Sequence, residues 1–78
     1  MRQRVKLPDL GDSATAVVVV EWRVAVGDRV AADQTLLTVE TDKVDTDVPS
    51  PVSGVVVELL VESGAEVGIG EALCVIDS

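Results

Sequence analysis

The residues whose side chains could take part in a reaction or bind a ligand lie in one stretch, VETDKVDTDVPSP, at positions 39–51. Lys43 is the only cation in it and is the first candidate for a functional residue. The alternative is a solvated lysine in a hairpin turn, since short motifs often match by chance. Asp42, Asp45 and Asp47 surround Lys43 and could act as acid and base or as calcium ligands.

The carboxylates fit a strand better than a metal site. The EF-hand pattern fails because the stretch lacks its central glycine and its distal glutamate at the required spacing. Alternation with a period of two instead predicts that Val44, Thr46 and Val48 face one side of a strand. Asp45 and Asp47 then face water. We therefore predict no metal site and no catalytic residue.

Composition removes several function classes. The chain has no histidine, which excludes Ser–His and Cys–His nucleophile pairs and zinc sites built on histidine. A net charge of −8 argues against nucleic acid as a partner. No apolar run is long enough to span a bilayer, so we expect no membrane association. An autonomous enzyme is the least favoured class.

An internal repeat organises the chain. Shifting the sequence by 37 residues aligns positions 18–41 with positions 55–78 and places apolar residues largely on apolar residues. Gly27 falls on Gly64, which indicates turns that require positive φ. Trp22 falls on Leu59, which favours packing over docking on a partner. Cys74 falls on Leu37 and is expected to be a small buried hydrophobic residue.

The repeat and the valine content predict an all-β fold for a single domain over residues 1–78. We expect a flattened eight-stranded β-barrel or sandwich of two four-stranded antiparallel sheets with approximate two-fold symmetry, a barrel-sandwich hybrid. The expected strands are about 4–7, 17–24, 29–31, 35–41, 44–48, 55–61, a short piece between the turns at 63–64 and 68–70, and 72–77. Under this symmetry the chain ends lie together, and Lys43 lies exposed at the opposite tip.

These motifs carry a family resemblance over nearly the whole chain. The segments VKLPDLGD, EWRVAVGD, ETDKV, VPSPVSGVV and GEALCVI resemble the lipoyl domain of dihydrolipoamide acyltransferases. Those proteins are the E2 components of 2-oxo-acid dehydrogenase complexes. The resemblance implies that Lys43 is the covalent attachment residue for lipoic acid, with Asp42 and Val44 flanking it. The family glycines fall on Gly27 and Gly54, which would support recognition of the turn.

The resemblance also implies a role and its partners. The lipoyl group on Lys43 would act as a swinging arm that accepts an acyl group from thiamine-dependent E1. It would deliver this group to the E2 acyltransferase core for transfer to coenzyme A and be reoxidised by E3. A lipoyl ligase or transferase would install the group. Glu40, Asp45 and Asp47 would dock on a basic E1 surface, or would simply form a solvated acidic face.

Other families fit less well. A biotinyl carrier domain of a biotin-dependent carboxylase is the main alternative, but Asp42 and Val44 stand where its pattern has methionines. A purely structural hairpin of this type needs no lysine at the tip, and the glycine-cleavage carrier is longer. We expect the chain to be an N-terminal fragment of a longer E2, monomeric when isolated. Its expected location is the cytoplasm, or otherwise the mitochondrial matrix after removal of a transit peptide.

Overall fold

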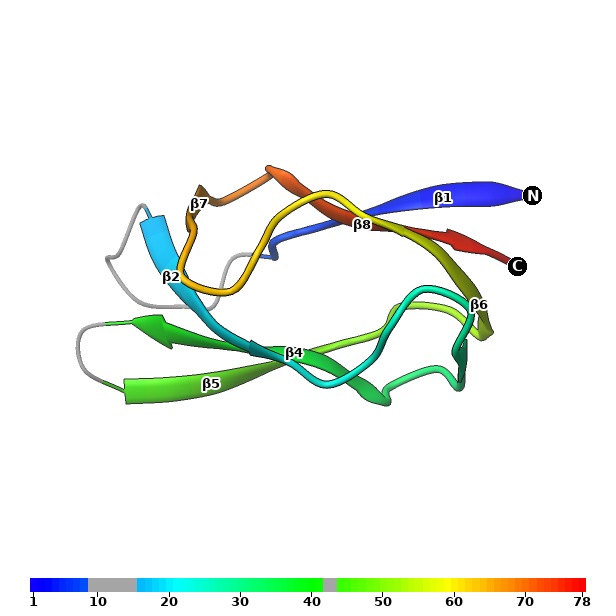
Figure 1. Ribbon diagram of the computed structural model, residues 1–78, viewed down its shortest axis with the longest axis horizontal. Helices are drawn as coiled ribbons and strands as arrows, with labels where there is room; N and C mark the ends of the chain where they lie inside the picture. Colours follow the sequence, from blue (N-terminus) through cyan, green and yellow to red (C-terminus); the bar gives the residue numbers. More distant parts are fainter. Residues whose placement is uncertain (9–15, 42–43) are drawn as a thin grey trace.

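In the described part of the chain, eight strands form two four-stranded antiparallel sheets that face each other (Figure 1). The computed structural model describes residues 1–8, 16–41 and 44–78. The strands are β1 (Arg2–Lys6), β2 (Ala16–Trp22), β3 (Arg29–Val30), β4 (Thr35–Thr41), β5 (Val44–Pro49), β6 (Gly54–Leu59), β7 (Glu66–Gly68) and β8 (Ala72–Asp77). The β1 sheet has the order β1-β8-β6-β3, and the β5 sheet has the order β5-β4-β2-β7.

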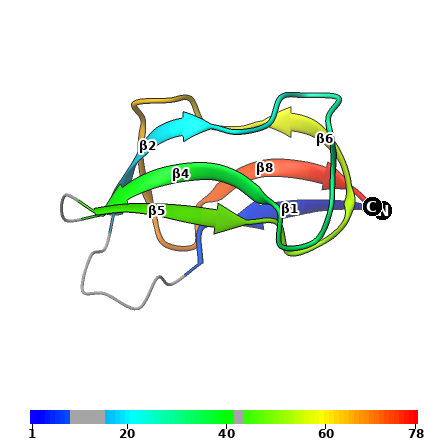
Figure 2. The same ribbon diagram turned by 90° about the horizontal axis from the view of Figure 1, so that it is seen from below.

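The predicted fold class is confirmed, and the sheets form a sandwich. In the described part of the chain, β1 and β3 are the edges of one sheet, and β5 and β7 are the edges of the other. The sheets therefore do not close into a continuous barrel. Figure 2 shows β5 and β1 along the same long side of the molecule, so two open edges lie on that side.

The two-fold repeat is confirmed by the strand register. Val19 is paired with Val39, and 37 residues later Val56 is paired with Ile76. A bulge follows Val19 in β2, and a second follows Val56 in β6. Because bulges increase the local twist of a strand, the two sheets bend in the same way and fit each other.

The predicted glycine turns have the expected backbone geometry. Gly27 has φ 96° and Gly64 has φ 90°. The Gly27 N–H donates to the Val56 carbonyl at 2.7 Å, and the Gly64 N–H donates to the Val19 carbonyl at 2.6 Å. Each turn is thus fixed to a strand of the other half, which joins the two sheets at points where a side chain at the turn would be strained.

The core is a thin layer of aliphatic side chains between the sheets. Its central members are completely shielded from solvent, as expected for residues on the inner faces of two packed sheets. They are Leu36, Leu37, Val39, Val56, Leu73, Cys74 and Ile76. Valine and leucine make up most of this layer, so a chain of 78 residues still obtains a continuous core.

Most strand boundaries differ from the prediction by one or two residues, and the first two strands show why. The first strand covers Arg2–Lys6 instead of residues 4–7, because its pairing with β8 continues to Arg2 opposite Asp77. The second strand ends at Trp22 instead of position 24, although Val24 remains buried. Hydrophobic pattern predicts burial, whereas the extent of a strand depends on its ladder partner.

The chain ends lie together, as predicted. The Met1 amine donates to the Ser78 carbonyl at 2.7 Å, and the Ser78 N–H donates to the Met1 carbonyl at 2.9 Å. We call this the terminal end of the sandwich. At the opposite end of its 33 Å long axis, β4 and β5 pair up to Thr41 and Val44 (Figure 1). We call that the hairpin end.

Candidate functional site

The hairpin end is where the sequence places the candidate lysine. Thr41 is paired with Val44, and the two residues between them in the sequence are Asp42 and Lys43. Asp42 and Lys43 lie outside the described residues. The site is therefore built from the described ends of β4 and β5 and from the side chains on them.

Burial decreases along β5 toward the hairpin end. Val48 is buried, Thr46 is half-buried, and Val44 is 61% exposed. Asp45 and Asp47 are exposed, as the predicted alternation requires, whereas burial on the side of Val44, Thr46 and Val48 does not extend to Val44. The apolar core lies under the middle of the sheet, so the alternating pattern loses its buried partner at the end of the strand. An exposed valine thus follows Lys43 directly.

Two carboxylates face each other across the hairpin. Glu40 on β4 and Asp45 on β5 are both exposed and directly opposite in the register. Like charges in this position destabilise a sheet by a few tenths of a kcal/mol to about 1 kcal/mol. In the described parts of the chain, neither side chain forms an ion pair. Among the described side chains, no cation compensates this pair of charges.

The symmetry of the molecule supplies a comparison. At the terminal end, Asp77 is the repeat equivalent of Glu40, and its partner across the strands is Arg2 on β1. Residues of opposite charge lie across the strands there, and the Asp77 carboxylate is 3.3 Å from the Met1 amine. The hairpin end thus has two acids opposite each other at a position where the other half of the molecule has an arginine opposite an acid.

Asp47 has a different environment from Glu40 and Asp45. The Thr38 hydroxyl donates to the Asp47 carboxylate at 3.1 Å, and the Arg23 Nε–H donates to the Thr38 hydroxyl at 3.2 Å. Thr38 is buried, and Arg23 also lies 3.6 Å from Glu21. These bonds join the β4 and β5 strands to the segment after β2. Asp47 therefore has a structural role in holding the edge strand β5.

The sequence interpretation did not identify the role of Thr38. One signal was present, because Thr38 aligns with Val75 in the repeat and is thus a polar residue at an apolar position. The repeat alone could not show that Arg23 and Asp47 meet there. That requires the register of β4 with β5.

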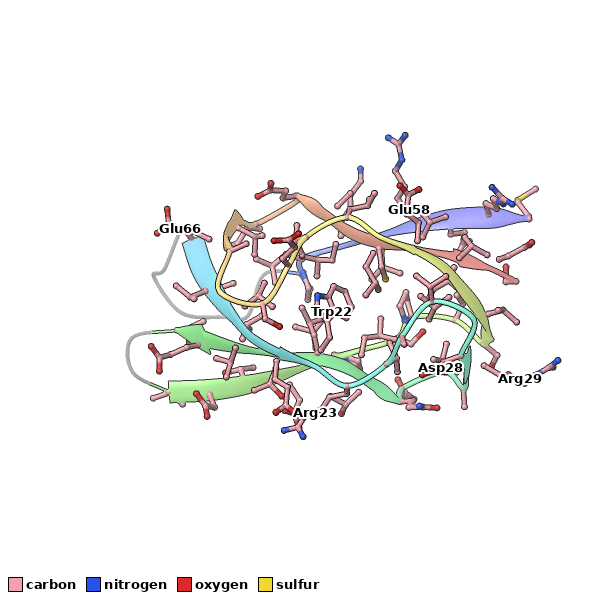
Figure 3. All side chains as sticks on the ribbon, viewed as in Figure 1. Trp22, Arg23, Asp28, Arg29, Glu58 and Glu66 are labelled. Carbon is pink, nitrogen blue, oxygen red and sulfur yellow. The ribbon has the colours of Figure 1, made fainter. Side chains whose placement is uncertain are left out.

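The two predicted glycines lie away from the hairpin end. A Cβ atom at Gly54 would come within 2.5 Å of the carbonyl oxygen of Asp77, beside the C-terminus. Gly27 precedes Asp28 and Arg29, which Figure 3 shows toward the side of the termini. The structure does not bring Gly27 and Gly54 to Thr41 and Val44. Their predicted support for recognition of the turn stays a prediction and would act through the fold.

Trp22 and Cys74 are structural residues, as predicted. The Trp22 indole N–H donates to the Val61 carbonyl at 3.0 Å, and its ring packs against the core (Figure 3). Burial raises the pKa of the Cys74 thiol to about 11, so the group remains protonated at neutral pH. A protonated buried thiol is inert as a nucleophile.

The described residues contain no cluster of three or more metal-ligating side chains. They also contain no helix with the length and hydropathy that crossing a membrane requires. Lys43, which lies outside the described residues, stays the predicted candidate for chemistry at the hairpin end.

Comparison with known proteins decides the family. The model of the Biotin_lipoyl family, described as biotin-requiring enzyme, matches residues 3–76. The chain belongs to the biotin/lipoyl family. Members of this family carry a cofactor that is covalently attached, and the family model alone does not separate biotin from lipoate.

Relatives separate the two branches of the biotin/lipoyl family. The chain is 46% identical, over 69 residues and 88% of its length, to the dihydrolipoyllysine-residue acetyltransferase component of the pyruvate dehydrogenase complex of Corynebacterium glutamicum. This alignment spans only 10% of that relative. The chain is therefore similar to one small part of a large acyltransferase.

Solved structures agree with this assignment. The lipoyl domain of the 2-oxoglutarate dehydrogenase complex of Azotobacter vinelandii superimposes with a TM-score of 0.75 at 29% identity, covering 96% of this chain and 95% of that domain. The Kluyveromyces lactis urea carboxylase has a TM-score of 0.83 at 23% identity, covering 99% of this chain and 6% of the carboxylase. The second likeness shows a shared fold alone. Within the biotin/lipoyl family, the chain is a lipoyl domain of the E2 type.

Proposed function

We propose that this domain is a carrier without its own active site and that lipoic acid is attached to Lys43 Nζ through an amide bond. The position of Lys43 between Thr41 and Val44 carries the proposal, because the paired strands end there, far from the terminal end. Bound lipoic acid supplies a dithiolane for reductive acylation and reoxidation. The chain supplies a rigid support that holds the attachment residue away from its tether.

The described residues around Lys43 fit this attachment. Glu40, Val44 and Asp45 are all exposed, so the strand ends on both sides of the lysine are open to solvent. A ligase can therefore reach the chain at this end. The buried side chain of Thr41 and the paired register keep β4 and β5 together up to the attachment position.

We further propose that Glu40, Asp45 and Asp47 direct the hairpin end to a basic surface on the thiamine-dependent E1 component. The unfavourable pairing of Glu40 with Asp45 supports this role, since it does not serve stability. Asp47 contributes charge from a fixed position because Thr38 holds its carboxylate. The E2 acyltransferase core and E3 would be the other partners of the arm, and the isolated domain would be monomeric.

Intact mass tests the attachment residue. The wild-type domain is coexpressed with a lipoyl ligase and lipoate, beside Lys43→Gln and the matched control Lys6→Gln. We expect one lipoyl adduct on the wild type and on Lys6→Gln, and no adduct on Lys43→Gln. Modification of Lys43→Gln would overturn the assignment of the residue, and attachment of biotin by a biotin ligase would overturn the assignment of the cofactor.

A further inference from the structure

Strand β1 carries an unusual concentration of positive charge. The whole chain has 6 lysine and arginine residues against 14 acidic ones, yet Arg2, Arg4 and Lys6 all lie on this one strand. All three are exposed, and they alternate with Gln3 and the buried Val5. The proposed carrier function makes no use of these cations.

The backbone of β1 is open along one side. Within the described residues, β1 pairs with β8 alone and forms the edge of its sheet (Figure 2). Met1 and Ser78 exchange both of their backbone hydrogen bonds, so they form a hydrogen-bonded pair. In an antiparallel ladder such pairs alternate with pairs whose N–H and C=O groups point outward. The outward groups therefore belong to Arg2 and Arg4, the same residues that carry the cationic side chains.

Few internal carboxylates compensate these cations. Arg4 lies opposite Val75, and Lys6 lies opposite Ala72. Arg2 lies opposite Asp77, but the Asp77 carboxylate is 3.3 Å from the Met1 amine. In the described portion of the chain, no ion pair involves Arg2, Arg4 or Lys6. The charges are thus available to another molecule.

We propose that β1 is a docking edge for an extended acidic segment of a partner protein, which adds to the β1 sheet as a further strand. The open N–H and C=O groups of Arg2 and Arg4 would supply backbone hydrogen bonds to this segment. Carboxylates at every second position of the segment would lie beside Arg2 and Arg4, at the distance of cross-strand neighbours. This interaction is separate from the attachment of a cofactor at Lys43.

The charge pattern makes the edge selective. A second β1 strand would place arginine beside arginine, which disfavours pairing of two identical edges. The symmetry-related edge, β5, carries Asp45 and Asp47 and would repel an acidic segment. The net charge of −8 does not prevent local binding, because charges beyond about 8 Å are largely screened at physiological ionic strength.

Nuclear magnetic resonance can test this edge on the intact domain. The 15N-labelled domain is titrated with a capped synthetic peptide of alternating threonine and glutamate. A peptide of the same composition with its glutamates in one block, and one of alternating threonine and lysine, serve as controls. We expect shifts of the β1 amides and their β8 partners with the alternating acidic peptide only, and we expect binding to weaken as salt is added.

Two variants that each remove one positive charge show which edge of the sheet the peptide contacts. Arg4→Gln should weaken binding at least about fivefold, as expected for loss of a charged cross-strand pair next to the backbone contact. Arg29→Gln, on the other edge of the same sheet, should change binding less than about twofold. Urea unfolding of both variants checks that they fold, and Arg2→Gln replaces Arg4→Gln if the latter does not.

Three outcomes would overturn the proposal. One is the absence of shifts at peptide concentrations of about 1 mM, where even weak docking is visible. Another is an equal response to the block peptide, which would indicate general attraction without strand addition. The third is an equal loss of binding in Arg4→Gln and Arg29→Gln. Failure of lipoylation at Lys43 would leave this proposal unaffected.

Discussion

At the scale of single residues, the most informative described group is the Cys74 thiol. It is completely buried, and burial raises its pKa from 9.0 to about 11. A neutral thiol therefore contributes to stability below the pKa of the unfolded chain, and this contribution is lost as the pH rises through the folded pKa. The chain has no tyrosine or histidine to obscure this effect.

We predict that raising the pH from about 8.5 to about 11 lowers the free energy of unfolding by up to about 3 kcal/mol, because each pKa unit corresponds to about 1.4 kcal/mol. Urea unfolding at several pH values measures this loss. Cys74→Ala should be less stable than the wild type at neutral pH. It should not show the additional loss of unfolding free energy at alkaline pH that the thiol causes. Equal alkaline slopes for the variant and the wild type would contradict the explanation.

The two glycines predicted to assist recognition are needed for different physical reasons. A Cβ atom at Gly54 would collide with backbone of Asp77, whereas a Cβ atom at Gly27 meets no atom within 4 Å. Gly27 is constrained only by its φ of 96°. The difference between collision and backbone strain can be measured.

We predict that Gly54→Ala costs about 3 kcal/mol or more through overpacking, while Gly27→Ala costs about 1–2 kcal/mol through backbone strain. Asparagine tolerates positive φ better than alanine, so Gly27→Asn should cost less than Gly27→Ala. Gly54→Asn should cost at least as much as Gly54→Ala. Thermal or urea unfolding gives the four values, and similar costs at both positions would show that the Asp77 contact has no part.

At the scale of strands, the β4–β5 hairpin combines a stable base with an unfavourable tip. Thr38 and Asp47 fix β5 to β4 near the middle of the sheet, whereas Glu40 and Asp45 repel each other nearer the hairpin end. At the equivalent position beside β1, Arg2 lies opposite Asp77, so no like charges face each other there. The proposed docking of the hairpin end on E1 would account for a pair of like charges that does not stabilise the sheet.

We predict that Glu40→Arg stabilises the domain by about 0.5–1 kcal/mol, because it places opposite charges across the strands. The same change should slow reductive acylation by E1, measured as kcat/KM for the lipoylated domain. Glu58→Arg changes the net charge equally on the other sheet (Figure 3) and should leave acylation nearly unchanged. If both variants slow acylation equally, net charge and not the hairpin end controls the approach.

The sequence predicts the strands well because both halves of the repeat show the same pattern of apolar core positions. The strands at 35–41 and 72–77 have the predicted bounds, since their apolar residues lie in the centre of both sheets. The exposure of Val44 was not predicted, because alternation cannot show where the core beneath a strand ends. The charge reversal between β5 and β1 likewise appears only in the register, which pairs Asp45 with Glu40 and Arg2 with Asp77.

The candidate site is predicted from sequence more completely than it is tested by the structure. Lys43 and Asp42 were identified by motif and lie outside the described residues, so their roles stay predictions. The structure shows that the carboxylates of Glu40, Asp45 and Asp47 do not share one environment. Asp47 is bound by Thr38, while Glu40 and Asp45 have no such partner among the described side chains. Sequence reasoning had treated these three acids alike.

At the scale of the whole molecule, the two chain ends and the strand ends on either side of the proposed attachment position lie at opposite ends of the 33 Å axis. Met1 and Ser78 lie together at the terminal end, and the strands around Lys43 pair at the hairpin end (Figure 1). A domain fused to either chain end would therefore leave the sandwich at the end opposite the paired Thr41 and Val44. This arrangement suits a domain that aligns with only a small part of its relative.

We predict that fusing a folded domain to either terminus changes the initial rate of lipoylation by less than about twofold, because the additions lie at the end opposite the lysine. Intact mass over time gives the rate for each fusion. The unfused domain and Lys43→Gln serve as reference and blank. A loss of more than about tenfold in either fusion would contradict the separation of the two ends.

The pairing of the chain ends also determines how the domain responds to a mechanical load. Because β1 and β8 are antiparallel neighbours with Met1 opposite Ser78, a pull on both ends acts across the ladder and not along it. The backbone bonds of this pair then break first, followed by those further along β1 and β8, one after another. Under tension the two strands therefore separate one residue pair at a time, beginning at the terminal end.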